Sequence, residues 1–330
     1  MTNKKKPTAR EQSAYKKTTP KVYDNIPPLH IAISAFQTFA LSEGFGNIEI
    51  KADGLVHRFR PEGQRKGKNG YYCVYPDGYP AGYIGDFKND RYLTWHYKSE
   101  KPLNPEQQAE IKRNMQKMRK KRLADQQARY AQGRVTANNV WNRGIPASSE
   151  HPYLVKKHCE GLAKYLRQDA KGNLIVPLYK NKRLVGIQYI SPHGSKFFSK
   201  NTELKGSYFV IGDLKKSFDS VYVSEGASSG HSIHILANNA PVFIAMNANN
   251  LEPVACAIRK KWADVSVIIA CDNDVREDKD AINIGVDCAN KAALACGGRV
   301  SIPQMPDNSK CDWNDLYCLA LDSEGADNDK

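Results

Sequence analysis

Three acidic residues in the C-terminal third follow apolar runs at a spacing that suits metal-assisted chemistry. Glu225 comes directly after VYVS, and Asp272 and Asp274 come directly after VSVIIAC. In an extended chain, residues two apart point to the same side, so Asp272 and Asp274 are expected to lie together. Clustered carboxylates repel one another unless a cation lies between them, and hard divalent ions such as Mg²⁺ prefer oxygen ligands. The spacing therefore predicts a divalent-cation site.

A further acidic segment, Asp312-Trp313-Asn314-Asp315, follows the apolar run RVSIP and a polar loop. Asp312 can complete or flank the same site. Any single acid after a strand can also be a solvated loop residue. The joint pattern of strand-Glu-Gly, strand-Asp-x-Asp and a later Asp-x-Asn-Asp favours a shared site.

The elements that must position these acids alternate between strand and helix. Over residues 217–321, strands are predicted at VYVS, VFIAM, VSVIIAC and RVSIP, separated by the helical segments SSGHSIHILANN, LEPVACAIRKKWA and KDAINIGVDCANKAALACGG. This order predicts an α/β domain with a mostly parallel, doubly wound sheet. Ligand sites in such sheets lie beyond the carboxyl ends of the strands, where both acidic clusters fall.

Upstream, residues 26–101 predict a small α+β module, with a short helix followed by aromatic strands and tight turns. The aromatic residues fit the core of a small domain. Beside Arg58, Arg60, Arg65, Lys66 and Lys68 they also fit a stacking platform for single strands. Residues 104–134 predict a basic linker helix, capped by Asn104 with Pro105 in its first turn, that is either a solvated connector or an arm along phosphates.

Residues 136–216 contain the runs LIVPLY, RLVGIQYI and SYFVIG and predict a β-rich basic subdomain. Residues 1–25 carry seven Lys and Arg against two acids, which is typical of a flexible basic tail. This tail either touches phosphates or is simply a solvated terminus. Residues 322–330 form an acidic tail.

The charge divides unevenly along the 330 residues, whose net charge is +14. Residues 216–330 hold 10 Lys and Arg against 17 Asp and Glu, and residues 1–215 hold 39 against 18. The basic excess is therefore upstream, where it predicts a polyanionic partner. No apolar run reaches the roughly 18 residues of a membrane span, and no signal-like segment follows the N-terminal lysines. The chain is expected to be cytoplasmic and not to act at a membrane.

Residues 220–321 resemble a Toprim domain, the metal-binding catalytic fold shared by bacterial-type primases, topoisomerases and some nucleases. The segments VSEG and CDND carry the resemblance. Within this group, the chain is most similar to the DNA primases of plasmids, phages and integrative elements. Additional matching stretches are HPYLVKKH, YLRQDAKGNLIVPLY, KRLVGIQYISPHGSKFF, LKGSYFVIG and CDWNDL, so the resemblance covers about residues 136–321.

The resemblance implies roles for particular residues. Asp272 and Asp274 would hold Mg²⁺ or Mn²⁺, Glu225 would act as a metal ligand or as an acid/base, and Asp312 would complete or flank the metal site. Lys196 and Lys205 match positions of cationic contacts to nucleotide phosphates or template. Arg183 is a looser match, and Lys200 is a candidate through its proximity to them.

The expected activity is DNA primase activity: synthesis of short RNA primers from NTPs on a single-stranded DNA template, in the replication of a mobile genetic element. None of the eight cysteines is spaced as a Cys-x-x-Cys pair, so a zinc ribbon and zinc are not expected. No helicase phosphate-binding loop is present, so a separate replicative helicase is the expected partner. Two alternatives stay open: a Toprim nuclease, and a non-catalytic protein that binds single-stranded DNA as a replication accessory.

Overall fold

The structure is a computed structural model that describes residues 27–64, 67–76, 79–89, 91–98, 104–275 and 283–328. The predicted basic tail, Arg65, Lys66 and the last residues of the acidic tail lie outside these ranges. The chain divides into two compact units, Met1–Leu123 and Ala124–Lys330. Each unit is described by itself.

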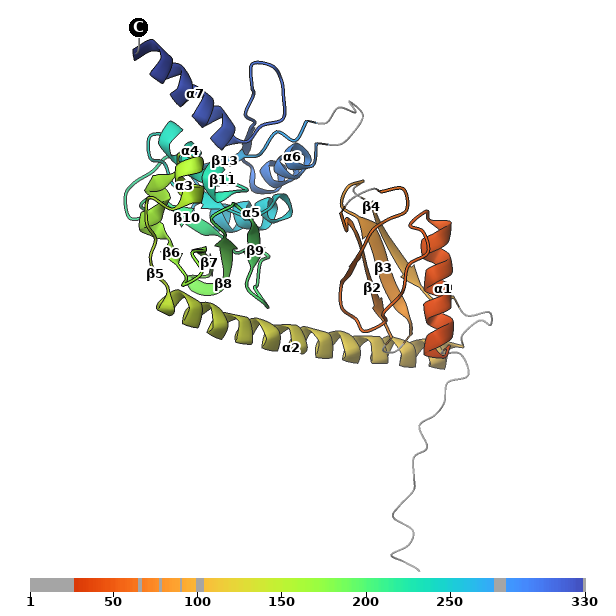
Figure 1. The fold of residues 1–330 in the computed structure, drawn as a ribbon. Coiled ribbons are helices and arrows are strands. Elements are labelled where there is room, and N and C mark those ends of the chain that lie inside the picture. The colour runs from red at the N-terminus through yellow and green to blue at the C-terminus, as the bar shows by residue number, and fades with distance from the viewer. Residues whose placement is uncertain are drawn as a thin grey trace, which may run out of the picture. The chain divides into compact units, whose positions relative to one another are not determined.

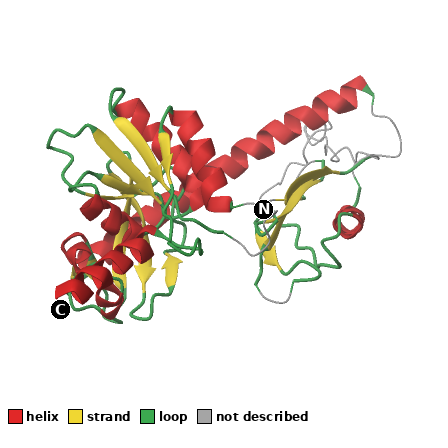
Figure 2. Ribbon diagram, turned by 90° about the horizontal axis from the view of Figure 1, so that it is seen from above, coloured by secondary structure: helices red, strands yellow, loops and turns green. Residues whose placement is uncertain are grey.

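Unit 1 is a four-stranded antiparallel sheet with one helix, as the sequence predicts. Helix α1 (Leu29–Ser42) lies along a sheet of consecutive strands: β1 (His57–Phe59), β2 (Gly70–Tyr75), β3 (Ala81–Asp86) and β4 (Arg91–His96). Figure 2 shows α1 end-on beside this sheet. Phe36 of α1 is fully buried, and its ring meets that of Trp95 edge-on at 5.2 Å. The buried aromatic residues of this unit therefore form its core.

Helix α2 (Pro105–Arg143) begins at the predicted residue but ends nine residues beyond the predicted end at 134. Asn104 caps its start: Oδ1 accepts from the Gln107 amide at 2.8 Å, and Gln107 Oε1 accepts from the Asn104 amide at 3.0 Å. Gly133, which reads as a helix stop, instead lies inside the helix and is buried. A Cβ at Gly133 would lie 2.2 Å from the Asn201 carbonyl oxygen, so glycine permits a close approach rather than ending the helix.

Unit 2 contains two sheets. The first is the predicted β-rich part, an antiparallel sheet of β5 (Ile145–Pro146), β6 (Arg167–Gln168), β7 (Leu174–Lys180), β8 (Arg183–Ile190) and β9 (Lys196–Phe198), in chain order. Between β5 and β6 lie helix α3 (Pro152–Lys156) and a 3₁₀ turn at Glu160–Tyr165. Asn181 and Lys182 form the tight turn between β7 and β8, and both have positive φ angles, of 49° and 62°.

The second sheet confirms the predicted mostly parallel arrangement. Its order is β10-β12-β11-β13-β14, and the strands are β10 (Phe209–Ile211), β11 (Ser220–Ser224), β12 (Val242–Ile244), β13 (Ser266–Ala270) and β14 (Arg299–Ser301). All neighbours are parallel except β10, an antiparallel edge strand on β12. The run SYFVIG was predicted with the β-rich subdomain, but its strand β10 pairs in this second sheet. The domain boundaries read from the sequence stay a prediction.

Helices cover both faces of the second sheet (Figure 1). Helix α4 (Ala227–Leu236) packs on β10, β11 and β12, whereas α5 (Leu251–Lys261) and α6 (Ile284–Cys296) pack on each other and on β13. Helix α7 (Trp313–Asn328) packs on α4. In the described part of the chain, no helix combines the length and apolar character needed to cross a membrane.

Strand β11 has β12 on one side and β13 on the other, so the chain reverses its direction of winding at β11. Such a reversal opens a crevice beyond the carboxyl ends of the central strands. Glu225 follows β11, and Asp272 lies two residues beyond the end of β13. The topology therefore brings the predicted acids to this crevice.

Candidate active site

Glu225 is a partly buried acid at the carboxyl end of β11. Its Oε1 is shielded from solvent and has no hydrogen-bond partner among the described residues. Burial, reinforced by the negative charges of Asp272 and Asp274, raises the pKa of Glu225 to about 8. Without a bound cation, this side chain therefore favours its protonated form at neutral pH.

Asp272 has the same character at the end of β13. Its Oδ1 is buried and also lacks a partner within the described ranges. Burial and the charges of Asp312 and Asp274 raise the pKa of Asp272 to about 7, against the opposing effect of Lys196 and Lys310. Glu225 and Asp272 are thus two adjacent, partly buried carboxyls, each with one buried oxygen that lacks a partner among the described residues.

Asn273, between the two aspartates, connects the acidic segment to neighbouring segments through hydrogen bonds. Its backbone pairs with Cys311, through N–H···O contacts of 2.9 and 3.1 Å. Its side-chain amide donates to the Pro303 carbonyl at 3.1 Å and accepts from Asn283 Nδ2 at 3.0 Å. Asn283 in turn caps α6, because its Oδ1 accepts from the Val286 amide at 3.3 Å. The start of α6 and the segment before α7 are therefore both tied to the acidic segment.

Gly285, in the first turn of α6, leaves space beside the buried acids. A Cβ at this position would lie 2.7 Å from the Asp272 carbonyl oxygen and 3.3 Å from Glu225 Oε1. Any other residue would crowd both groups. The absence of a side chain here leaves room next to an oxygen that has no other partner.

The two remaining acids of the predicted site are engaged elsewhere. Asp274 forms an ion pair with Lys310. Asp312 caps α7, with Oδ1 accepting from the amides of Asn314 at 2.8 Å and Asp315 at 2.9 Å. Asp312 remains close enough to raise the pKa of Asp272, so it flanks the site electrostatically. Its predicted role as a metal ligand stays a prediction.

The residues fit a hard divalent cation only in part. Within the described ranges, no group of three His, Cys, Asp or Glu side chains is already arranged to hold a metal. Glu225 and Asp272 nevertheless offer two buried carboxylate oxygens without partners, and Gly285 leaves space beside them. Oxygen donors of this kind suit Mg²⁺ or Mn²⁺. A third carboxylate ligand would come from Asp274, which pairs with Lys310 through Oδ1, or from Asp312, which caps α7 through Oδ1.

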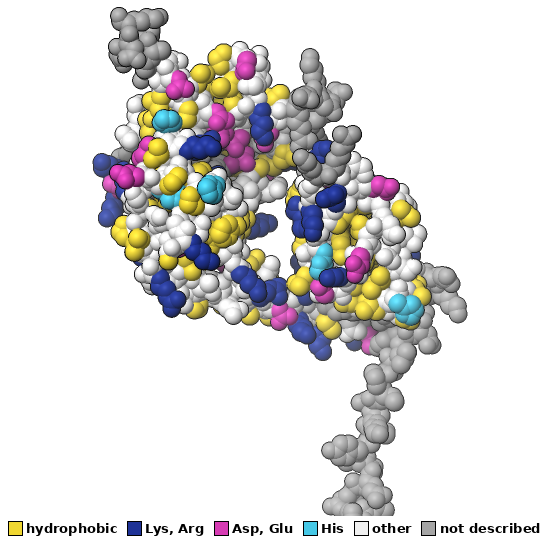
Figure 3. Space-filling model, in the orientation of Figure 1, with side chains coloured by type: hydrophobic (Ala, Val, Ile, Leu, Met, Phe, Trp, Pro, Cys, Tyr) yellow, Lys and Arg dark blue, Asp and Glu magenta, His cyan; other side chains and the backbone are white. Residues whose placement is uncertain are grey.

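Of the predicted cationic residues, Lys196 is the one that acts on the acids. It begins β9, is exposed, and lowers the pKa of Asp272. Its Nζ lies 5.6 Å from the centre of the Tyr153 ring. Figure 3 shows acidic side chains of unit 2 gathered on one face with basic side chains beside them.

The other three predicted cations lie apart from this cluster. Lys205 lines a separate pocket alongside α5. Arg183 lies in a shallow hollow beside Arg134. Lys200 is exposed in the turn after β9. The nucleotide- and DNA-binding roles of all four residues stay predictions.

Three residues of this region were not found from the sequence. Lys310 pairs with Asp274. Burial would lower the pKa of Lys157, but Asp312 and Asp315 outweigh it and raise that pKa. The fully buried Asn314 donates to the Lys157 carbonyl at 2.6 Å and to Ser232 Oγ at 3.1 Å, which joins α7 to α3 and α4. Their positions in the sequence could have indicated Lys310 and Asn314, because Lys310 lies two residues before Asp312 and Asn314 lies two residues after it.

The sequence of this chain is similar to two curated proteins. The chain is 28% identical to a DNA primase TraC of Escherichia coli over 259 residues, which are 76% of this chain and 24% of the relative. A second Escherichia coli DNA primase TraC is 27% identical over 277 residues, covering 82% of this chain and 19% of the relative. The chain therefore spans a quarter or less of the length of these curated relatives.

Two solved structures show distant similarity. The primase fragment of the bacteriophage T7 primase-helicase protein matches with a TM-score of 0.38 and 12% identity, covering 82% of this chain and 98% of that one. A DNA primase domain from Pseudomonas aeruginosa matches with a TM-score of 0.32 and 14% identity, covering 50% and 58%. The family model of the Toprim domain matches residues 220–323, which contain β11 to β14 and all four acids. Residues 220–323 of this chain are therefore a Toprim domain.

Proposed function

We propose that this protein is a DNA primase, which joins NTPs into short RNA primers on single-stranded DNA. The observation that carries the proposal is the pair of partly buried acids, Glu225 and Asp272, each with a buried oxygen that lacks a described partner, at the switch point of a Toprim sheet. The similarity to proteins named DNA primase supports the choice among Toprim activities. The proposal includes a role in the replication of a mobile element and a separate helicase as partner.

The acidic edge suits phosphoryl transfer, because its charge must be compensated before a phosphate can approach. Mg²⁺ or Mn²⁺ held by Glu225 and Asp272 would neutralise charge that develops on the transferring phosphate. Glu225 holds a proton on its carboxyl at neutral pH when no cation is present, since its pKa is about 8. A cation bound by Glu225 would displace this proton, so Glu225 would serve either as a metal ligand or, where it does not touch the metal, as an acid/base.

Lys196 is the residue placed to contact the triphosphate. It is exposed, and its charge acts on Asp272, so an incoming phosphate beside Asp272 would meet a cation. Lysine binds phosphate as a mobile point charge, which suits a group that moves during the reaction. Its loss should weaken nucleotide binding while leaving the acids in place.

The strand that carries Lys196 also presents aromatic side chains suited to a template. Phe197 and Phe198 are 49% and 37% exposed, and the Phe197 ring stacks on Tyr189 at 4.9 Å. Exposed aromatic rings beside a lysine form a surface on which the bases of a single strand can stack. Template and nucleotide would thus meet at β9.

A primer-synthesis assay tests this function. The full chain is incubated with labelled NTPs, single-stranded templates of varied sequence, and Mg²⁺ or Mn²⁺. Template-dependent oligoribonucleotides are expected, and Glu225→Gln and Asp272→Asn should each reduce their yield at least 100-fold, whereas the exposed-surface control Glu150→Gln should not. No product on any template would overturn the proposal. Metal-dependent degradation of DNA without NTPs would select a nuclease instead.

A further inference from the structure

A lysine-lined pocket of about 710 Å³ lies on unit 2, formed by the turn after β7, the segment before β10, and α5. None of the described residues that line it is acidic, although Lys180 pairs with Glu203 outside the lining at 2.8 Å. The basic ones are Lys180, Lys182, Lys205, Lys260 and Lys261. None of the acids of the active site lines it. The second sheet is otherwise part of an acidic region of the chain, so this concentration of positive charge needs its own explanation.

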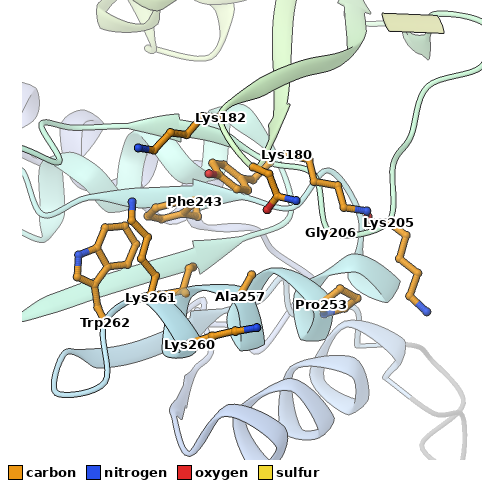
Figure 4. Close-up of a pocket in the computed structure, with 13 residues that line it drawn as sticks. Lys180, Lys182, Lys205, Gly206, Phe243, Pro253, Ala257, Lys260, Lys261 and Trp262 are labelled. Atoms are coloured by element: carbon orange, nitrogen blue, oxygen red, sulfur yellow. The ribbon is translucent and has the colours of Figure 1, made fainter. Parts of the chain in front are cut away.

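Aromatic rings line the inner side of this lysine pocket. Phe243 is fully buried, and its ring centre lies 4.9 Å from that of Tyr208 and 5.9 Å from that of Trp262. Trp262 is half-buried, with Lys261 Nζ 3.9 Å from its ring centre. Figure 4 shows Lys182 and Trp262 toward one end, Lys205 and Pro253 toward the other, and Phe243 between them.

Hydrogen bonds hold the lysine-bearing segments in place. Buried Asn250 accepts from the Gly206 amide at 2.6 Å and donates to the carbonyls of Ser207 and Ala245 at 2.8 Å. Lys180 Nζ donates to the Lys205 carbonyl at 2.8 Å. These contacts fix the segment that carries Lys205 against the end of β12. The pocket wall is therefore built into the fold.

Backbone pairing fixes the opposite wall. Tyr179 and Tyr208 exchange two backbone hydrogen bonds of 2.7 and 2.9 Å, which link the end of β7 to the second sheet. The turn at Asn181 and Lys182 follows directly, so Lys182 is held over the pocket. Lysines on two walls thus face a shared aromatic surface.

We propose that the lysine pocket binds a segment of single-stranded nucleic acid outside the active site. Four of the five lysines are exposed, and spaced ammonium groups suit successive backbone phosphates better than one compact anion. The partly exposed rings of Tyr208 and Trp262 provide a surface for a base, which a purely anionic peptide would leave unused. No arginine is among the described residues that line the pocket, and phosphate contacts by lysine carry no base identity, so binding through these lysines is independent of sequence.

Fluorescence anisotropy with a labelled thymidine oligonucleotide and the full chain measures this binding. The variant Lys182→Ala/Lys261→Ala should bind at least fivefold more weakly at 150 mM salt than the wild type. Its plot of log affinity against log salt should be shallower by about 1.4, since each phosphate contact on a single strand contributes about 0.7. The control Lys164→Ala/Lys171→Ala removes the same charge from exposed positions outside the pocket and should bind as the wild type does.

Crosslinking gives a local readout that other DNA contacts of the chain cannot mimic. An oligonucleotide containing 5-iododeoxyuridine should crosslink to Trp262 or Tyr208 in the wild type and in Asp272→Asn. Loss of synthesis in Asp272→Asn with crosslinking retained separates this site from the proposed catalytic one. Unchanged affinity and salt slope in the pocket variant, or crosslinks that all lie elsewhere, would overturn the inference. Loss of labelled-NTP binding alone would assign the pocket to a free nucleotide and also overturn it.

Discussion

Lys310 forms an ion pair with Asp274, while the adjacent acids Glu225 and Asp272 each keep a buried oxygen without a partner among the described residues. Within the described ranges one ion pair thus serves an edge that carries three clustered acids, and Lys196 acts on Asp272 without pairing with it. Because two of the acids remain uncompensated, burial and mutual repulsion raise their pKa values. The raised pKa values of Glu225 and Asp272 should therefore affect two measurable quantities, the dependence of stability on pH and the affinity for divalent cations.

The variant Glu225→Gln should weaken the dependence of stability on pH. The pKa of Glu225 is about 8 in the folded state and 4.5 in its ordinary, solvent-exposed form, so between these values the folded state keeps a proton that the unfolded chain has lost. Stability of the metal-free wild type therefore falls as pH rises through this window. Glutamine does not ionise, so the variant should be more stable at pH 8 by on the order of 2 kcal/mol, and nearly equal at pH 4.5.

Urea unfolding with a chelator at several pH values between 4.5 and 8 checks this. The exposed Glu150→Gln should leave the dependence on pH unchanged. If the free energy of unfolding changed with pH in the same way in Glu225→Gln and in the wild type, the raised pKa of Glu225 would be contradicted. Addition of Mg²⁺ should stabilise the wild type more than the variant, because a ligand that binds the folded state raises its stability.

The variant Lys310→Ala should bind divalent cations more tightly. Lys310 occupies Asp274 and lowers the pKa values of Glu225 and Asp272, so it competes with any added cation. Removing its charge should strengthen Mn²⁺ binding by about threefold to tenfold, as expected for one partly screened charge. Calorimetry at pH 8.5, where protons compete least, measures the change.

Lys291→Ala is the matched control for that experiment. Lys291 also pairs with an aspartate, Asp287, but on the exposed surface of α6. Its removal should leave Mn²⁺ affinity within about twofold of the wild type, since screened surface charges act weakly. Weaker binding in Lys310→Ala would show that the lysine orders the site rather than competing for it.

The variant Gly133→Ala should destabilise unit 2, although alanine is the better helix former by about 1 kcal/mol. A Cβ at this position would lie 2.2 Å from the Asn201 carbonyl oxygen, so the helix or the loop must shift. Such overpacking costs about 1–3 kcal/mol and should outweigh the gain in propensity. Urea unfolding measures the difference, and the exposed Gln132→Ala should be neutral or slightly stabilising. A stabilised Gly133→Ala protein would contradict the close approach.

The order of strands and helices was predictable from residues 217–321 because each element carries its own local pattern. Parallel pairing then followed from the alternation of strand and helix, and it brought Glu225 and Asp272 to one edge. Gly133 was misleading because a glycine that permits close packing has the same local signature as one that ends a helix. The pairing of β10 with β12 depends on contacts distant in sequence, which no local pattern records.

The hydrogen-bond and ion-pair partners of the acids could not be predicted from the sequence, because they also depend on contacts between distant segments. The pairing of Lys310 with Asp274 depends on how the loop before α7 returns to the end of β13. The role of Asp312 depends on where α7 begins, because an acid just before a helix caps it whether or not it also faces a metal. Composition placed the basic excess upstream, yet Lys260 and Lys261 of the lysine pocket lie in the acidic part of the chain.

Substitution of Asp312 separates its role as a helix cap from a role as a metal ligand. Asparagine caps helices about as well as aspartate, so Asp312→Asn should keep the stability of the wild type, whereas Asp312→Ala should lose about 1 kcal/mol. If capping is its role, Asp312→Asn should bind Mn²⁺ within about threefold of the wild type, because the change acts only through the pKa of Asp272. Calorimetry beside Asp272→Asn, which should lose measurable binding, provides the comparison. A loss in Asp312→Asn as large as that in Asp272→Asn would instead assign Asp312 a direct contact with the metal.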